Sequence, residues 1–239
     1  MKQYEYVIKV MENNRGFATL GHLYQKTDIS KWKTKTPFAT IRRIVQDPRF
    51  FFKIKPGLWA LNDYRERVLR LFDIQPNDKQ SNERFEHTYY QGLLVELGNM
   101  QGFNTFIPNQ DKNRMFLTKK LGEVTTLQNI FRFTYEETLR RAKTVDTIWF
   151  NERNLPDSFF EVEHSTDFLN SMGKYFDLQD FNANFYLVSH QSKRKKFLQV
   201  IKLGMFSNIK VKIKFWDYET VSELHTTTFK LREVQNKLP

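Results

Sequence analysis

The fold is decided by Val145-Asp146-Thr147-Ile148-Trp149-Phe150 and by Ser158-Phe159-Phe160-Glu161-Val162-Glu163-His164. Both runs are rich in β-branched and aromatic residues, and residues 151–157 between them favour a turn, so the sequence predicts two strands of one hairpin. A hairpin centred on this turn places Asp146 roughly opposite Glu161. Because side chains alternate between the faces of a strand, Glu161 and Glu163 leave the same face, and His164 leaves the opposite one.

Three carboxylates on neighbouring strands repel one another unless a divalent cation neutralises them. Acidic residues two apart on a strand also occur on solvated faces, but the apolar neighbours of Glu161 predict a buried sheet, where unpaired carboxylates are unfavourable. Oxygen ligands of this kind suit Mg²⁺, or Mn²⁺ as its substitute, rather than zinc. In a chain of formal net charge +11, such a site predicts metal-assisted hydrolysis of a polyanion.

Positive charge is concentrated in the first third of this 239-residue chain. Residues 1–70 hold 15 Lys and Arg against 6 Asp and Glu, whereas residues 71–239 hold 23 against 21. This asymmetry indicates a phosphate-binding module. The absence of cysteine excludes disulfides and cysteine-bound zinc. No apolar run approaches the ~20 residues of a membrane helix and no signal peptide is evident, so we expect a cytoplasmic protein without a membrane partner.

Residues 1–72 are predicted to form a winged-helix DNA-binding domain. Apolar spacing predicts helices at residues 4–13, 19–24 and 36–46, the last with Thr36 as N-cap, and a two-strand hairpin follows around Lys55-Pro56-Gly57. In this arrangement the third helix enters the major groove, where Arg and Gln read base edges and Lys neutralises phosphate. A plain solvated helix face is the alternative. The positions expected to contact DNA are Lys33, Lys35, Thr36, Thr40, Arg42, Arg43, Gln46 and Lys55.

The same segment resembles the HARE-type winged helix found at the ends of bacterial restriction enzymes and of some chromatin proteins. The resemblance covers roughly residues 1–70. It rests on Thr36-Pro37, Ile41-Arg42-Arg43-Ile44, Phe50 and Gly57-Leu58-Trp59-Ala60-Leu61.

A polar stretch at residues 73–83 is the predicted linker to a second domain, residues 84–239. Besides the hairpin, this domain is predicted to contain helices at 83–100, 135–142, 168–181 and 193–203 and strands at 104–107, 184–189 and 210–216. This order predicts an α/β sandwich with a mixed central sheet.

The element order and the carboxylates resemble the PD-(D/E)xK nuclease fold, an α/β/α core of the restriction-endonuclease type. Its signature is an acid at the start of one strand, then an acid, a spacer and a lysine on the next. Asp146 and Glu161 match the two acids, and Glu163 stands where lysine usually does. The resemblance implies that Asp146, Glu161 and the carbonyl of Val162 bind Mg²⁺. Two roles stay open for Glu163, as acceptor of a proton from the attacking water or as ligand of a second metal ion.

A more specific resemblance, to a group of bacterial and archaeal restriction-type nucleases, covers about residues 85–205. It rests on residues 87–99, 145–150 and 176–179, and most sharply on Glu161-Val162-Glu163-His164-Ser165-Thr166. His87 and Gln91 share one helix face and match positions that border the active site in those nucleases, which implies that one of them positions water or phosphate. Glu86 is an alternative, and a structural role is equally open for His87.

Together these features predict a Mg²⁺-dependent, site-specific, type II-like restriction endonuclease that cuts double-stranded DNA. One active site per chain predicts a homodimer on a palindromic site, and a restriction enzyme implies a companion DNA methyltransferase in the cell. Two alternatives stay open. One is a non-catalytic DNA-binding regulator whose nuclease-like domain dimerises, and the other is a nuclease acting on methylated DNA or repair intermediates.

Overall fold

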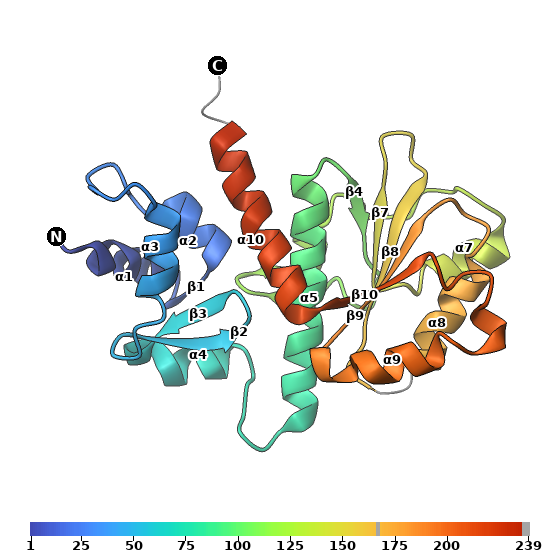
Figure 1. Ribbon diagram of the computed structural model, residues 1–239, viewed down its shortest axis with the longest axis horizontal. Coiled ribbons are helices and arrows are strands. Elements are labelled where there is room, and N and C mark those ends of the chain that lie inside the picture. The colour runs from blue at the N-terminus through green and yellow to red at the C-terminus, as the bar shows by residue number, and fades with distance from the viewer. Residues whose placement is uncertain (166–167, 236–239) are drawn as a thin grey trace. The chain divides into compact units, whose positions relative to one another are not determined.

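The computed structural model describes residues 1–165 and 168–235 (Figure 1). Thr166, the last residue of the most specific sequence match, lies outside the described residues. The chain divides into two compact units, Met1–Asn82 together with the chain from Ser222 onward (unit 1) and Glu83–Val221 (unit 2). The second domain was predicted to run to residue 239, whereas the described residues from Ser222 group with unit 1. Within residues 1–165 and 168–235, no helix combines the length and the apolar character needed to cross a membrane.

Unit 1 is built from short helices and a small sheet. In chain order its elements are α1 (Gln3–Asn13), β1 (Phe17–Thr19), α2 (Leu20–Lys26), α3 (Pro37–Ile44), β2 (Phe51–Lys55), β3 (Leu58–Leu61), η1 (Asn62–Tyr64), α4 (Arg65–Leu71) and the part of α10 (Tyr218–Gln235) that follows Val221. The antiparallel sheet has the order β1-β3-β2. The predicted three helices and hairpin are present, while β1, α4 and α10 were not predicted. Apolar side chains from α1, α2, α3 and the sheet form the core of this unit.

Of two expectations about α3, one is confirmed and one is wrong. Thr36 occupies the predicted N-cap position, although its side chain makes no capping hydrogen bond within the described part of the chain. Thr40 was predicted to be an exposed DNA-facing position, yet it is buried, and its hydroxyl donates to the carbonyl of Thr36 at 3.1 Å. Because this bond to the preceding turn satisfies the hydroxyl, Thr40 can be buried beside the core residue Ile41.

The helix α5 (Lys79–Met100) begins inside the predicted linker. Asp78 accepts a hydrogen bond from the backbone N–H of Ser81 at 3.0 Å, which is the geometry of an N-cap. Asn82 folds back on Gln75, donating to its carbonyl at 2.7 Å and accepting from its N–H at 3.1 Å. The polar residues of the predicted linker therefore partly serve to start and hold this helix.

Unit 2 is a mixed α/β structure. After α5 it contains β4 (Asn104–Phe106), β5 (Met115–Phe116), β6 (Lys119–Lys120), α6 (Leu121–Val124), α7 (Glu136–Ala142), β7 (Thr147–Phe150), β8 (Pro156–Val162), α8 (Phe168–Asp177), β9 (Asn184–Ser189), η2 (Gln191–Lys193), α9 (Arg194–Val200), η3 (Gly204–Phe206) and β10 (Ile213–Asp217). Five strands form one sheet of order β10-β9-β8-β7-β4. β7 is antiparallel to β4 and β8, whereas β8, β9 and β10 run parallel, so the predicted mixed sheet is confirmed.

Helices cover both faces of this sheet (Figure 1). On one face, the indole N–H of Trp149 in β7 donates to the carbonyl of Leu94 in α5 at 3.0 Å. On the other face, Tyr175 of α8 packs on Phe185 of β9 with ring centroids 5.0 Å apart. Strand alternation sends Glu161 to the face covered by α8, and there it reaches the candidate site.

Candidate active site

Two carboxylates meet where β7 begins and β8 ends. Thr147 pairs with Phe160, so the antiparallel register sets Asp146 opposite Glu161, as predicted. The backbone N–H of Asp146 lies 3.4 Å from Glu161 Oε1, and the backbone N–H of Val162 donates to Asp146 Oδ2 at 2.8 Å. Glu161 is only 4% exposed. The sheet therefore holds a carboxylate pair in which Glu161 is buried and the side chain of Asp146 is 14% exposed.

Lys174 of α8 completes this pair, and it was not predicted. Its Nζ donates to both carboxylate oxygens of Glu161 at 2.9 Å and to the carbonyl of Thr144 at 2.7 Å. Lys174 lies three positions after the buried Ser171 and so shares its helix face, the one turned towards the sheet. That helical spacing is the signal in the sequence that could have found it. The lysine that meets the acids therefore comes from the helix α8, whereas the strand position where a lysine is usual holds Glu163.

The pKa values of the two carboxylates are shifted in opposite directions, because burial acts on both but their partners differ. Burial raises the pKa of Glu161 well above its ordinary value, and the negative charge of Asp146 raises it further, against the lowering effect of Lys174. Burial also acts to raise the pKa of Asp146, but His87, Lys174 and the Val162 amide outweigh it, so this pKa is lowered. Asp146 is thus the member of the pair that holds its negative charge most firmly.

His87 and Gln91 of α5 both reach Asp146. His87 Nε2 lies 3.2 Å from Asp146 Oδ2. Burial lowers the pKa of His87, but the Asp146 carboxylate outweighs it and leaves that pKa raised. The side-chain amide of Gln91, fully buried, donates to the carbonyl of Asp146 at 2.6 Å. The two predicted helix residues therefore lie at the site, where Gln91 holds the backbone of Asp146 and His87 its side chain.

Glu163 follows the last residue of β8 and is held by other groups. Its carboxylate accepts from the N–H of Ser165 at 2.8 Å and from the hydroxyl of Ser171 at 2.9 Å. The bond to Ser171 of α8 agrees with the predicted common face of Glu161 and Glu163. Whether Glu163 takes part in the chemistry stays a prediction.

His164 points to the opposite side, as strand alternation predicted. Its Nδ1 lies 3.2 Å from Glu86 Oε2 and 3.0 Å from the hydroxyl of Tyr218. Glu86, the alternative acid on α5, is therefore engaged with His164. These contacts suit a structural role for both residues.

The fit of a metal ion to this site depends on the two carboxylates. Across residues 1–165 and 168–235, no group of three or more His, Asp or Glu side chains is arranged to hold a metal ion. Mg²⁺, however, commonly takes one or two protein carboxylates and completes its shell with water and substrate phosphate. The carboxylate oxygens of Asp146 and Glu161 are ligands of that kind, and in this structure His87 and Lys174 contact them. The backbone N–H of Val162 donates to Asp146 within the site. That the backbone carbonyl of Val162 binds the metal ion stays a prediction.

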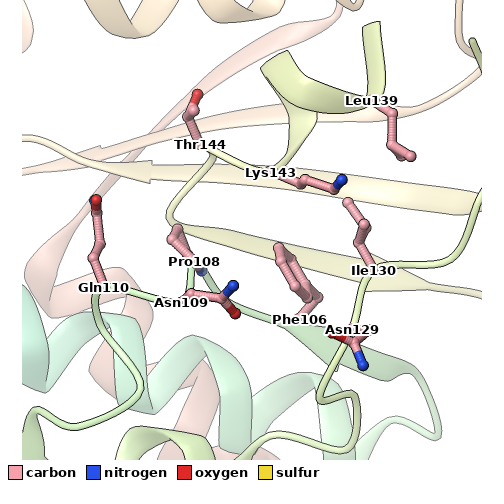
Figure 2. A pocket seen from close by; sticks show the side chains of 9 residues that line it. All are labelled: Phe106, Pro108, Asn109, Gln110, Asn129, Ile130, Leu139, Lys143 and Thr144. Carbon is pink, nitrogen blue, oxygen red and sulfur yellow. The ribbon is translucent and has the colours of Figure 1, made fainter. Parts of the chain in front are cut away.

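Unit 2 also contains a pocket of about 350 Å³, whose lining reaches Thr144, two residues before Asp146 (Figure 2). Thr144, whose carbonyl binds Lys174, lines it, as does Phe106 at the end of β4. Three of its lining side chains are carboxamides and four are apolar, a combination that can contact sugars and bases. The remaining lining residues are Pro108, Asn109, Gln110, Asn129, Ile130, Leu139 and Lys143.

The predicted DNA-contacting residues of unit 1 form a separate set. Most of them are exposed around the start and along the outer side of α3, whereas Lys55 at the end of β2 is half-buried and Thr40 is buried. The exposed members are Lys33, Lys35, Thr36, Arg42, Arg43 and Gln46.

Comparisons with known proteins relate this chain to a type II restriction enzyme. A family model described as the type II restriction enzyme NmeDI C-terminal domain matches residues 71–238. The chain is also 24% identical over 161 residues to the type II restriction enzyme NmeDI of Neisseria meningitidis serogroup C. That alignment covers 63% of this chain but only 45% of the relative, so the chain spans less than half the length of the curated protein it matches. No solved structure matches the chain significantly. Because the family model covers well over half of its length, the chain belongs to the family of the type II restriction enzyme NmeDI C-terminal domain.

Proposed function

We propose that this protein is a type II-like restriction endonuclease that hydrolyses phosphodiester bonds at specific sites in double-stranded DNA, with Mg²⁺ as cofactor and Mn²⁺ as its substitute. The observation that carries the proposal is the buried pair of Asp146 and Glu161 with Lys174 bound to Glu161, in a member of a restriction-enzyme family. Acids opposite one another on adjacent strands, with a lysine beside the second, support a PD-(D/E)xK site whose lysine comes from α8.

In this proposal Asp146 and Glu161 hold the metal ion. When bound, Mg²⁺ supplies positive charge that polarises the scissile phosphate and lowers the pKa of water. Lys174 places a second positive charge at the same point, where it stabilises the negative charge that develops on the phosphate oxygens. His87 and Gln91 keep Asp146 in position through its side chain and its backbone carbonyl.

Proton transfer requires an acceptor near the phosphate. Glu163 leaves the same strand face as Glu161 and is half-buried, so water can reach it. We assign to it the proton of the attacking water, whose oxygen bonds to phosphorus as one phosphate–sugar bond breaks. The hydrogen bonds from Ser165 and Ser171 fix the orientation of its carboxylate.

Unit 1 is proposed to act as a winged-helix DNA-binding domain. Its element order and the exposed basic residues of α3 support this role. Cleavage of both strands with one carboxylate pair per chain supports a homodimer on a palindromic site. A cytoplasmic location and a companion methyltransferase that protects the host DNA are part of the same proposal.

The test is cleavage of unmethylated plasmid and phage DNA by the purified full chain with Mg²⁺. We expect discrete fragments from the wild type, no cleavage by Asp146→Ala, and normal cleavage by Asp157→Ala, which removes an acid at the far end of the same hairpin. DNA binding should survive in Asp146→Ala. A folded wild-type protein that binds DNA and cuts neither unmethylated nor methylated DNA would instead favour the non-catalytic regulator.

A further inference from the structure

The segment that leads into the hairpin β5–β6 carries a buried charge that the proposed mechanism does not use. Asp111 is 1% exposed, although it lies in an irregular segment just before β5. Its Oδ2 accepts from the side-chain amide of Gln91 at 3.1 Å, and its Oδ1 lies 3.1 Å from Arg114 Nε. Burying a carboxylate is unfavourable unless charged and polar partners compensate. Asp111 therefore ties Arg114 to the same glutamine that holds Asp146.

Arg114 reaches the catalytic carboxylate through a second route as well. One of its terminal nitrogens lies 3.5 Å from His87 Nδ1, and the other nitrogen of that ring faces Asp146. The Arg114 side chain is 36% exposed, so part of the guanidinium faces solvent. A guanidinium carries five N–H donors in a planar fork that matches phosphate. Asp111 lies against Nε of this fork and His87 against one terminal nitrogen, which leaves the other terminal nitrogen for an anion.

The hairpin β5–β6 is held on α5 by its inner face. Phe116 is buried, and its ring lies 6.3 Å from that of Tyr89. A Cβ on Gly92 would come within 2.1 Å of Phe116, so only glycine lets the ring lie this close to the helix. Gly92 directly follows Gln91. The position of the hairpin is thus fixed to the part of α5 that carries the site.

The outer face of the hairpin is apolar and basic. Met115 pairs with Lys120 across the ladder, and both side chains leave the face opposite to Phe116 because strand side chains alternate. Met115 is 50% exposed, and Lys119 and Lys120 are exposed. Among the described residues no carboxylate forms an ion pair with the ammonium group of either lysine, although the backbone N–H of Lys120 donates to Glu123 at 3.0 Å. Residues 111–120 together carry four basic side chains and one acidic one.

We propose that residues 111–120, which we call the basic arm, contact DNA at the catalytic centre. Arg114 binds a backbone phosphate next to the carboxylate pair, and Met115 and Lys120 contact the neighbouring nucleotides in the groove. An apolar side chain beside lysines suits a DNA groove, because the apolar side chain contacts the sugar edges and the lysines contact the phosphates. The inference rests on the proposed endonuclease function and adds a second DNA contact, in unit 2, to that proposed for unit 1.

The first test measures DNA binding by the full chain over a range of salt concentrations without metal, so that no cleavage occurs. The probe is a pool of random-sequence duplexes, read by fluorescence anisotropy. Each lost phosphate contact makes the negative slope of log K against log salt less steep by about 0.9. We therefore expect this decrease for Arg114→Ala and for Lys120→Ala. Arg153→Ala, which removes the same charge from the turn at the opposite end of β7 and β8, should keep the wild-type slope.

The second test separates phosphate binding from folding. Arg114→Lys keeps the charge but loses the fork, so it should keep the salt slope while its cleavage rate with Mg²⁺ falls by about 100-fold, the effect of losing one preorganised donor. Thermal unfolding of each variant identifies any that fails to fold, and Lys120→Ala, being at the surface, carries the test in that case.

Each outcome decides one of the two proposals. Wild-type salt slopes in Arg114→Ala and Lys120→Ala overturn the basic arm, and so does an equal decrease in Arg153→Ala. If the wild type cuts DNA while these slopes stay unchanged, the endonuclease proposal stands without the arm. If the slopes decrease as expected but no DNA is cut, the arm stands as a binding element and the endonuclease proposal fails.

Discussion

Replacing Lys174 by methionine removes the cation that binds Glu161 and keeps a side chain of similar length. The lysine side chain is 12% exposed and that of Glu161 is 5% exposed, so water screens the pair little. At 2.9 Å, the Coulomb attraction between unit charges is about 6 kcal/mol at an effective dielectric constant of ~20. Removing one partner of a buried pair lowers the free energy of unfolding by about 3–5 kcal/mol, because the other charge stays buried and unpaired.

Glu161 can avoid part of this loss by binding a proton. Its pKa is already raised by burial and by Asp146, and without Lys174 it rises further. A carboxyl group whose folded pKa is raised stabilises the fold at low pH, and this contribution is lost as the pH rises above its ordinary value of 4.5. The difference in unfolding free energy between the wild type and Lys174→Met should therefore be small near that pH and grow towards neutrality.

Urea unfolding of the metal-free protein at a series of pH values measures this difference. Lys210→Met, which removes an exposed lysine from the same unit, is the matched control and should stay within about 0.5 kcal/mol of the wild type. Adding Glu161→Gln to Lys174→Met removes the unpaired charge and should recover part of the stability at neutral pH. A Lys174→Met protein as stable as the control at every pH would refute the buried ion pair.

Three further predictions follow from the contacts around α5 and β8. Because the pKa of His87 is raised, its ion pair with Asp146 is fully formed below the ordinary pKa of 6.5 and is lost as the pH rises through the raised pKa. In urea unfolding, the free energy of unfolding of the wild type should fall over that pH window, and that of His87→Gln should not. Equal pH profiles of the two proteins would contradict the ion pair. Gly92→Ala sets a Cβ 2.1 Å from Phe116 and should lower the free energy of unfolding by about 1–3 kcal/mol. Adding Phe116→Leu to the same chain should partly reverse this loss. An unchanged thermal midpoint in Gly92→Ala would contradict this packing. Glu163→Gln should reduce the cleavage rate by about 10²–10⁴-fold with little change in DNA affinity, and a wild-type rate would remove Glu163 from the mechanism.

Much of unit 2 follows from local sequence patterns. The turn between residues 151 and 157 and the β-branched and aromatic runs on either side predict the hairpin, and its register places Asp146 opposite Glu161. The i, i+4 spacing of His87 and Gln91 likewise carries both side chains to the same site on α5. These features depend on neighbours in the chain, so their periodicity is visible in the sequence.

The remaining features depend on contacts between distant segments. Lys174 reaches Glu161 only because α8 packs on the sheet, and Asp111 is buried only because its segment folds over α5. The strands β5 and β6 have two residues each, too few to show alternation. In unit 1 the hydroxyl of Thr40 donates to the carbonyl of Thr36 at the start of α3. This bond allows Thr40 to be buried, although its polar side chain predicted an exposed position.

We propose that Asp146 and Glu161 lie opposite each other in order to hold a divalent cation. The most direct measurement is the amount of Mn²⁺ bound per chain, read by electron paramagnetic resonance with the full protein and excess duplex DNA. We predict tight binding by the wild type, unchanged binding by Asp157→Ala, and loss of bound ion in both Asp146→Ala and Glu161→Gln. Equal Mn²⁺ binding by the wild type and these two variants, all folded and bound to DNA, would contradict the account.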